Sequence, residues 1–239
     1  MKLPSDKKAL LISRYHEIVQ RMEQACLLRD KKFTSPVTLI AVSKFQSVDQ
    51  IEELYREGHR DFGENYVQEL LEKDGELKKR GCSEIRWHFI GHLQKNKVKK
   101  LLPVVYCIHT IDSVELAGEV SRVSAQIEKT QSLPVFLEVN VDVERGKFGF
   151  MPDEVQKSAD LIRQFSGIRI QGLMCIPSQG EDPQPRFAFL RECSVACQNL
   201  MEGFLSMGMS SDFELAIQEG ATHVRVGTLL FGARSASNL

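Results

Sequence analysis

Short apolar runs alternate with longer amphipathic segments along nearly the whole chain. Apolar residues at positions 10, 11, 18, 22 and 25 recur with helical spacing and predict a leading helix over residues 6–30. The apolar runs that follow are rich in β-branched residues, which is typical of strands, and each precedes a segment with helical spacing. The predicted strands cover residues 37–42, 61–62, 85–90, 104–109, 134–141, 168–174, 204–206 and 222–226. The predicted helices lie near residues 51–55, 65–79, 98–101, 112–127, 152 onward, 185–201 and 211–219, with a short one after 226.

These segments make eight strand–helix units after the leading helix, without a long linker or low-complexity stretch. Near-continuous apolar strands are typical of a parallel sheet that is covered on both faces. Eight such units favour a closed (β/α)8 TIM barrel over an open doubly wound sheet. No Gly-x-Gly-x-x-Gly fingerprint follows the first strand, which disfavours a dinucleotide-binding domain. We therefore expect residues 1–239 to form one α/β barrel domain with an extra N-terminal helix.

Composition narrows the class of protein. The 239 residues are 42% hydrophobic and 26% charged, which is enough to bury a sizeable core. The net charge of −1 gives no reason to expect nucleic acid or an anionic membrane as partner. No apolar run approaches the roughly 20 residues of a membrane span, and the charged residues 1–8 lack the apolar segment of a signal peptide. We expect a cytoplasmic protein.

The six cysteines include no Cys-x-x-Cys pair, which fits a reduced cytosolic protein. Cys193 and Cys197 are four apart on a predicted helix, but that spacing alone is weak evidence for zinc. His88 and His92 are also four apart, yet Gly91 lies between them and no glutamate follows His88, so the metalloprotease pattern is absent. We expect no metal site.

Barrel active sites lie where strands end and their following loops begin. Lys44 occupies such a position because it follows six largely apolar residues. A lysine at an apolar barrel mouth is partly desolvated, which lowers its pKa and makes the amine a nucleophile that can form a Schiff base with an aldehyde cofactor. Alternatively, Lys44 points to solvent.

The loops after the seventh and eighth strands often form the phosphate site of a barrel. Here they read Ser206-Met207-Gly208-Met209-Ser210 and Gly227-Thr228. Glycines let backbone N–H groups approach an anion, and hydroxyls add donors. Arg225 and Gly227 share one side of the eighth strand, so a buried Arg225 could donate to a pyridine nitrogen. Alternatively, the glycines form plain turns and Arg225 pairs with a carboxylate such as Glu214.

Several motifs, taken in order, resemble the pyridoxal phosphate homeostasis protein family, also known as the proline synthetase co-transcribed homologue family. The resemblance covers about residues 5–234 and implies the barrel fold of bacterial alanine racemase. The motifs are Ala41-Val42-Ser43-Lys44, Phe62-Gly63-Glu64-Asn65-Tyr66, Trp87-His88-Phe89-Ile90-Gly91-His92-Leu93-Gln94-Lys95-Asn96-Lys97, Gly172-Leu173-Met174, Leu205-Ser206-Met207-Gly208-Met209-Ser210 and Val224-Arg225-Val226-Gly227-Thr228.

The resemblance also implies a cofactor, pyridoxal 5′-phosphate (PLP), and roles for particular residues. Lys44 would form the Schiff base with PLP, and Arg225 would face the pyridine nitrogen. The chain departs from the family in having Phe45 where a threonine usually follows the lysine. The stretch 140–149 also varies, so the pocket mouth is expected to differ. The remaining cofactor-binding residues would be Ser210, Gly227 and Thr228 at the phosphate, and Asn65, His88 and Met174 along the cofactor.

Binding is favoured over catalysis. Arginine stays protonated at physiological pH, so a pyridine nitrogen that faces Arg225 would stay unprotonated and the ring would be a weak electron sink. A two-base racemase also needs a second acid–base group, and the sequence shows no additional domain that would supply it. The resemblance implies a carrier or buffer of PLP with no established catalytic residue. The alternative is a weak PLP-dependent amino-acid racemase or lyase.

Partners other than PLP are less defined by the sequence. PLP-requiring apo-enzymes are possible recipients of the cofactor, and a monomer is favoured. The basic run Lys95-Asn96-Lys97-Val98-Lys99-Lys100 lacks the interleaved aromatic residues that stack on bases. We expect a solvated helix face there and no nucleic-acid binding.

Overall fold

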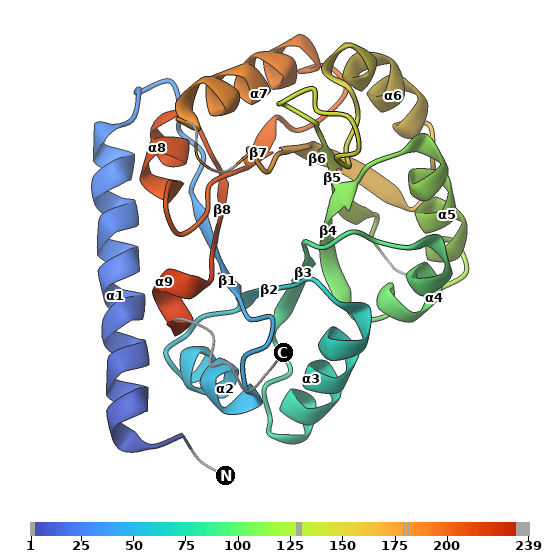
Figure 1. Cartoon of the computed structure of the whole chain (residues 1–239). Helices are drawn as coiled ribbons and strands as arrows, with labels where there is room; N and C mark the ends of the chain where they lie inside the picture. Colours follow the sequence, from blue (N-terminus) through green and yellow to red (C-terminus); the bar gives the residue numbers. More distant parts are fainter. Residues whose placement is uncertain (1–2, 128–130, 179, 181, 233–239) are drawn as a thin grey trace.

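The computed structural model describes residues 3–127, 131–178, 180 and 182–232. Eight parallel strands follow one another around a closed barrel, which Figure 1 shows along its axis. The strands are β1 Thr38–Val42, β2 Asp61–Glu64, β3 Arg86–Phe89, β4 Val105–Ile111, β5 Leu133–Glu138, β6 Ile168–Met174, β7 Phe204–Ser206 and β8 His223–Val226. The predicted (β/α)8 barrel is therefore confirmed.

The barrel closes between its first and last strands. Strand β1 pairs with β8 in parallel, in a register that sets Thr38 opposite His223 and Ala41 opposite Val226. A closed sheet leaves no unpaired strand edge, and it brings the carboxyl ends of all eight strands to one mouth. The turn after β1 and the loop after β8 are therefore neighbours, although they lie far apart in the sequence.

Helices cover the outside of the barrel. Helix α1 is the extra N-terminal helix that the sequence predicts, and it lies along α8, α9 and α2 on the outer surface (Figure 1). The helices are α1 Ser5–Leu28, α2 Val48–Arg56, α3 Val67–Lys79, α4 Val98–Leu101, α5 Val114–Ser124, α6 Val155–Ile162, α7 Gln184–Ala196, α8 Phe213–Gln218 and α9 Thr228–Phe231.

Buried apolar side chains form two separate clusters in the barrel. A large apolar core fills the layer between the strands and the helices, as expected where strands are buried on both faces. The second, smaller apolar cluster joins Cys107, Phe136 and Met174, with Phe204 packed against it. Alternation along each strand places His109 on the face of Cys107, and Arg225 on the face of His223. The inside of the barrel is therefore partly polar.

Strand β5 differs most from its predicted extent. The apolar run 134–141 predicts a strand through Val141, but β5 ends at Glu138. Beyond it, the Asn140 N–H donates to the carbonyl of Phe150 at 3.0 Å, and the Phe150 N–H donates to the carbonyl of Glu138 at 2.7 Å. These bonds fold residues 139–150 into a loop at the mouth of the barrel. The apolar run therefore continues beyond the end of the strand.

Candidate functional site

Lys44 lies in a tight turn directly after β1, at the mouth of the barrel. The Gln46 N–H donates to the carbonyl of Ser43 at 2.9 Å and closes the turn. Phe45 has φ of 61°, in the left-handed region that a bulky residue rarely adopts. Such a strained residue persists where its surroundings hold it in place. The turn therefore fixes the backbone that carries the half-buried Lys44.

A buried ion-pair cluster holds this turn. Lys73 reaches from α3 and its ammonium donates to the carbonyl of Ser43 at 2.6 Å, to Glu64 at 2.8 Å and to Glu69 at 2.6 Å. The Ser43 hydroxyl donates to Glu64 at 2.7 Å, and the Phe45 N–H donates to Glu69 at 2.5 Å. We call Ser43, Glu64, Glu69 and Lys73 the Lys73 cluster.

The Lys73 cluster is costly because it is buried. The Glu64 side chain is fully buried, and burial raises the pKa of its carboxyl while the Lys73 ammonium opposes that rise. Its Oε2 atom has no hydrogen-bond partner among the described residues. Taking such charges out of water costs several kcal/mol per ion, so they persist when the ion pair is intact. The sequence offered one signal, the i, i+4 spacing of Glu69 and Lys73 on a predicted helix.

The two predicted phosphate-type loops meet at Ser210. Its hydroxyl accepts from the N–H of Gly227 at 3.2 Å and from the N–H of Leu229 at 3.3 Å, at the start of α9. A Cβ atom on Gly227 would lie 3.3 Å from Cβ of Val42, tighter than most such contacts. The structure therefore brings Ser210, Gly227 and Thr228 together, beside the end of β1.

Arg225 is buried beneath the mouth, with 4% of its surface exposed. Its Nη1 donates to the Ser206 hydroxyl at 2.8 Å, and its Nη2 donates to the carbonyl of Cys175 at 2.9 Å. Burial lowers the pKa of Arg225 from its ordinary value. The alternative pairing with Glu214 is wrong, because that carboxylate accepts from Arg21 on α1 at 2.8 Å.

The other three predicted cofactor-lining residues lie in different places. Met174 is fully buried in the inner cluster of the barrel. His88 lies deeper, where its ring contacts His109 and Asp61. Asn65 lines a pocket of about 490 Å³ at the end of β2, and its Oδ1 is buried without a hydrogen-bond partner among the described residues.

Glu138, at the end of β5, is a titratable residue that the sequence did not single out. It is buried, with 9% of its surface exposed, and it lines a pocket of about 340 Å³ next to Asn140. Burial and then the negative charge of Asp112 raise its pKa to about 7, and the positive charge of Arg225 opposes the rise. A carboxyl that titrates near neutral pH is therefore present at the mouth.

One group of three described side chains has ligand atoms close enough to hold a metal ion, within 4.8 Å of one another: His88, Cys107 and His109. The two rings are already joined by a hydrogen bond of 2.9 Å. Burial raises the pKa of the Cys107 thiol well above its ordinary value, which disfavours the thiolate that metals bind. Hydrogen bonding therefore explains why these side chains lie close together.

His92, the basic run and the cysteines make ordinary structural contacts. His92 pairs with Asp112 at 3.2 Å and stacks on Phe148, so it does not face His88. Val98 and Leu101 of the basic run are buried while its lysines are exposed, as expected for a solvated helix face. All six cysteines are free thiols, and no helix among the described residues is long and apolar enough to cross a membrane.

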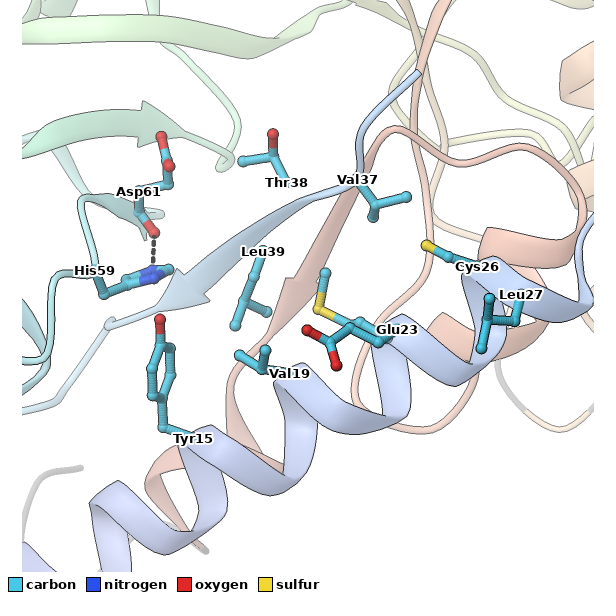
Figure 2. Close-up of a pocket in the computed structure, with 11 residues that line it drawn as sticks. Tyr15, Val19, Glu23, Cys26, Leu27, Val37, Thr38, Leu39, His59 and Asp61 are labelled. Atoms are coloured by element: carbon cyan, nitrogen blue, oxygen red, sulfur yellow. Dashed lines mark hydrogen bonds between the residues drawn. The ribbon is translucent and has the colours of Figure 1, made fainter. Parts of the chain in front are cut away.

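A pocket of about 640 Å³ lies at the opposite end of the barrel, between α1 and the start of β1 (Figure 2). Apolar side chains of α1 and β1 make up most of its wall. Asp61 and His59 lie at one end, where the His59 ring is 2.8 Å from the main-chain carbonyl oxygen of Asp61. The amino end of β2 therefore meets a cavity that the sequence did not predict.

The fold and the mouth residues define a barrel of the alanine racemase type, and residues 19–235 match the family model of the alanine racemase N-terminal domain. The pyridoxal phosphate homeostasis protein of Aquifex aeolicus is 39% identical over 227 residues, covering 92% of this chain and 97% of that protein. The human protein of that name is 39% identical over 232 residues, covering 91% of this chain and 84% of that protein.

A solved structure of PipY from Synechococcus elongatus, with PLP bound, is also similar. It has a TM-score of 0.73 and 37% identity, with 82% of this chain and 92% of that chain covered. The chain belongs to the pyridoxal phosphate homeostasis protein family, and the resemblance carried by its motifs is confirmed.

We predict that Lys73→Met lowers the free energy of unfolding by about 3–5 kcal/mol, because it leaves a buried carboxylate without its cation. Adding Glu64→Gln should recover most of the loss. Lys78→Met is the control, since Lys78 is an exposed residue of the same helix and its partner Asp74 keeps a second hydrogen bond, from Trp87 Nε1 at 3.0 Å; it should cost less than about 1 kcal/mol. Urea unfolding measures all three variants. An equal cost for Lys73→Met and Lys78→Met would contradict the role of the Lys73 cluster.

A second prediction concerns Glu138. Its pKa is raised from 4.5 to about 7, so the folded protein binds more protons than the unfolded chain between those values, and Glu138 should lower stability as pH rises through this window. Glu138→Gln should remove that part of the pH dependence and stabilise the protein above pH 7, by about 1–3 kcal/mol. Urea unfolding between about pH 4 and 8 measures it. Identical pH profiles for the two proteins would rule the prediction out.

Proposed function

We propose that this protein binds PLP as a Schiff base on Lys44 and acts as a carrier or buffer of the cofactor. The observation that carries the proposal is the meeting of three features at one mouth: a lysine held in a fixed turn, backbone N–H donors gathered on Ser210, and a buried arginine below them. The PLP-bound structure of the related PipY supports this assignment.

The donor set around Ser210 fits a phosphate. The N–H groups of Gly227 and Leu229 converge on one hydroxyl oxygen, and the same donors can bind an anionic oxygen. Gly227 has no side chain to block the approach, while Thr228 adds a hydroxyl at the first position of α9. The phosphate of PLP would therefore sit between the loops after β7 and β8, beside the turn of Lys44.

Arg225 determines what chemistry the site favours. PLP supplies an electron sink when its pyridine nitrogen is protonated. A guanidinium stays protonated at physiological pH and can only donate, so a nitrogen that faces Arg225 accepts a hydrogen bond and stays unprotonated. Met174 would pack beneath the ring, and Asn65 would line the cofactor from its pocket beside the mouth. These groups bind and orient the cofactor more than they activate it.

A second candidate function is weak racemase or lyase activity, which one observation favours. Glu138 lies at the same mouth with a pKa of about 7, which suits proton transfer at neutral pH. Incubating the PLP-loaded protein with single enantiomers of amino acids tests this function. Loss of optical purity that depends on both Lys44 and Glu138 would support it.

We also propose that the protein acts as a monomer in the cytoplasm and supplies PLP-requiring apo-enzymes. Six free thiols suit a reducing compartment. The large exposed apolar side chains among the described residues are distributed over several elements, as single exposed residues are on most monomers. Sedimentation velocity measures the association state, and a dimer at micromolar concentration would oppose this part of the proposal.

The central prediction is that Lys44→Ala abolishes the visible absorption band of the Schiff base, because the other amine at this turn, Lys73, is buried in ion pairs with Glu64 and Glu69. Lys99→Ala is the matched control, since Lys99 is an exposed lysine of the basic run, and it should leave the band unchanged. Absorbance spectra of the purified variants with added PLP make the measurement. A retained band in Lys44→Ala would refute the assignment.

A further inference from the structure

A continuous chain of hydrogen bonds runs through the inside of the barrel. Asp61 Oδ1 lies 3.0 Å from His88 Nε2, and His88 Nδ1 lies 2.9 Å from His109 Nε2. His109 Nδ1 lies 2.8 Å from the Ser206 hydroxyl, which accepts from Arg225 at 2.8 Å. All five residues are buried. We call them the interior chain.

The interior chain connects the two ends of the barrel. Asp61 begins β2 at the amino end, where it lines the pocket beside α1 in Figure 2 and accepts from Arg86 at 2.7 Å. Arg225 lies near the carboxyl end, beneath the loops that meet at Ser210. The three residues between them come from β3, β4 and β7. A side chain at the cofactor mouth is therefore linked to a carboxylate at the opposite end.

Neutral histidines allow one assignment of protons along the interior chain. Burial would raise the pKa of Asp61, but hydrogen bonds from Arg86 and His88 outweigh it and hold the pKa below its ordinary value. The carboxylate can then only accept, so His88 carries its proton on Nε2. Its Nδ1 must accept, which puts the proton of His109 on Nε2 and leaves His109 Nδ1 to accept from the Ser206 hydroxyl.

Burial keeps the rings of His109 and its neighbour His223 uncharged. Burial lowers the pKa of His109 well below its ordinary value. Burial likewise lowers the pKa of His223 to about 3, and its ring lies against those of His109 and Phe136. Phe136 stacks on His109 with ring centroids 4.5 Å apart. The charges that face the chain therefore lie at its ends, on Asp61 with Arg86 and on Arg225.

We propose that the interior chain is the positioning device of Arg225, and that Ser206, His109, His88 and Asp61 act on the cofactor site through it. Because the Ser206 proton is committed to His109, the oxygen of Ser206 presents its lone pairs to Arg225. The guanidinium is then held by Ser206 on one nitrogen and by the Cys175 carbonyl on the other. Its plane is fixed before any cofactor arrives.

The effect of the interior chain on PLP binding rests on the proposed function. The positioning of Arg225 by the chain does not. A fixed guanidinium offers its donor to the pyridine nitrogen without losing side-chain freedom upon binding, which raises affinity. His88 thus acquires a role that differs from direct contact with the cofactor. It is a positioning residue that acts through His109 and Ser206.

Side-chain nitrogen NMR of the protein without cofactor tests the chain directly. His88 and His109 should both be Nε2–H tautomers, and Arg225 should give separate, slowly exchanging Nη–H signals. Ser206→Ala should merge those Arg225 signals. An Nδ1–H tautomer at His109, or Arg225 signals that are already averaged in the unaltered protein, would overturn the proposal. So would displacement of the His88–His109 hydrogen bond by one equivalent of Zn²⁺.

Cofactor binding provides the second test. Ser206→Ala should weaken PLP binding about tenfold, since one hydrogen bond to a charged group is worth roughly 1.5 kcal/mol or more, and should shift the pH dependence of the Schiff-base band. Asp61→Asn, at the far end of the chain, should shift that pH dependence in the same direction. Ser121→Ala is the control, because it deletes the hydroxyl of another buried serine, which donates to the Ser166 carbonyl outside the barrel.

The two tests separate the proposals from each other. Tautomers as assigned, in a protein that does not bind PLP, would uphold the interior chain and reject the proposed function. PLP binding that responds equally to Ser206→Ala and Ser121→Ala would reject the positioning role and leave the proposed function standing.

Discussion

The constraint on which this structure depends is the burial of an arginine inside a parallel barrel. A guanidinium out of water needs acceptors in fixed places, and Arg225 has two, the Ser206 hydroxyl and the Cys175 carbonyl. Ser206 can serve because its hydroxyl donates to His109 Nδ1, and His109 can accept there because His88 and Asp61 complete the chain. The barrel interior therefore contains a polar column where side-chain layers of such barrels are usually apolar.

The mouth carries a second buried ionic group, and both serve the same site. The Lys73 cluster holds the turn of Lys44 from outside the strands, through the carbonyl of Ser43 and the N–H of Phe45. The interior chain holds Arg225 from below. Each is costly to bury, and each fixes one side chain of the candidate site. Such preorganisation suits a protein that holds a cofactor, because fixed side chains lose little conformational entropy when a ligand binds.

The sequence predicted the architecture well because parallel strands buried on both faces appear as apolar runs. Local sequence also explains where α5 begins, because the Ser113 hydroxyl before it accepts from the Leu116 N–H at 3.3 Å. It did not predict contacts that depend on barrel register. His109 and Ser206 lie 97 residues apart in the sequence. Their meeting follows from the closure of the barrel, which no local pattern contains.

The central claim, that Lys44 holds PLP at the mouth of this barrel, is tested most directly by trapping the linkage. The protein is loaded with PLP, reduced with borohydride and digested, and the peptides are analysed by mass spectrometry. The account predicts a reduced pyridoxyl phosphate adduct on the peptide that contains Lys44. An adduct confined to other lysines, or no adduct under conditions in which PLP remains bound, would contradict it.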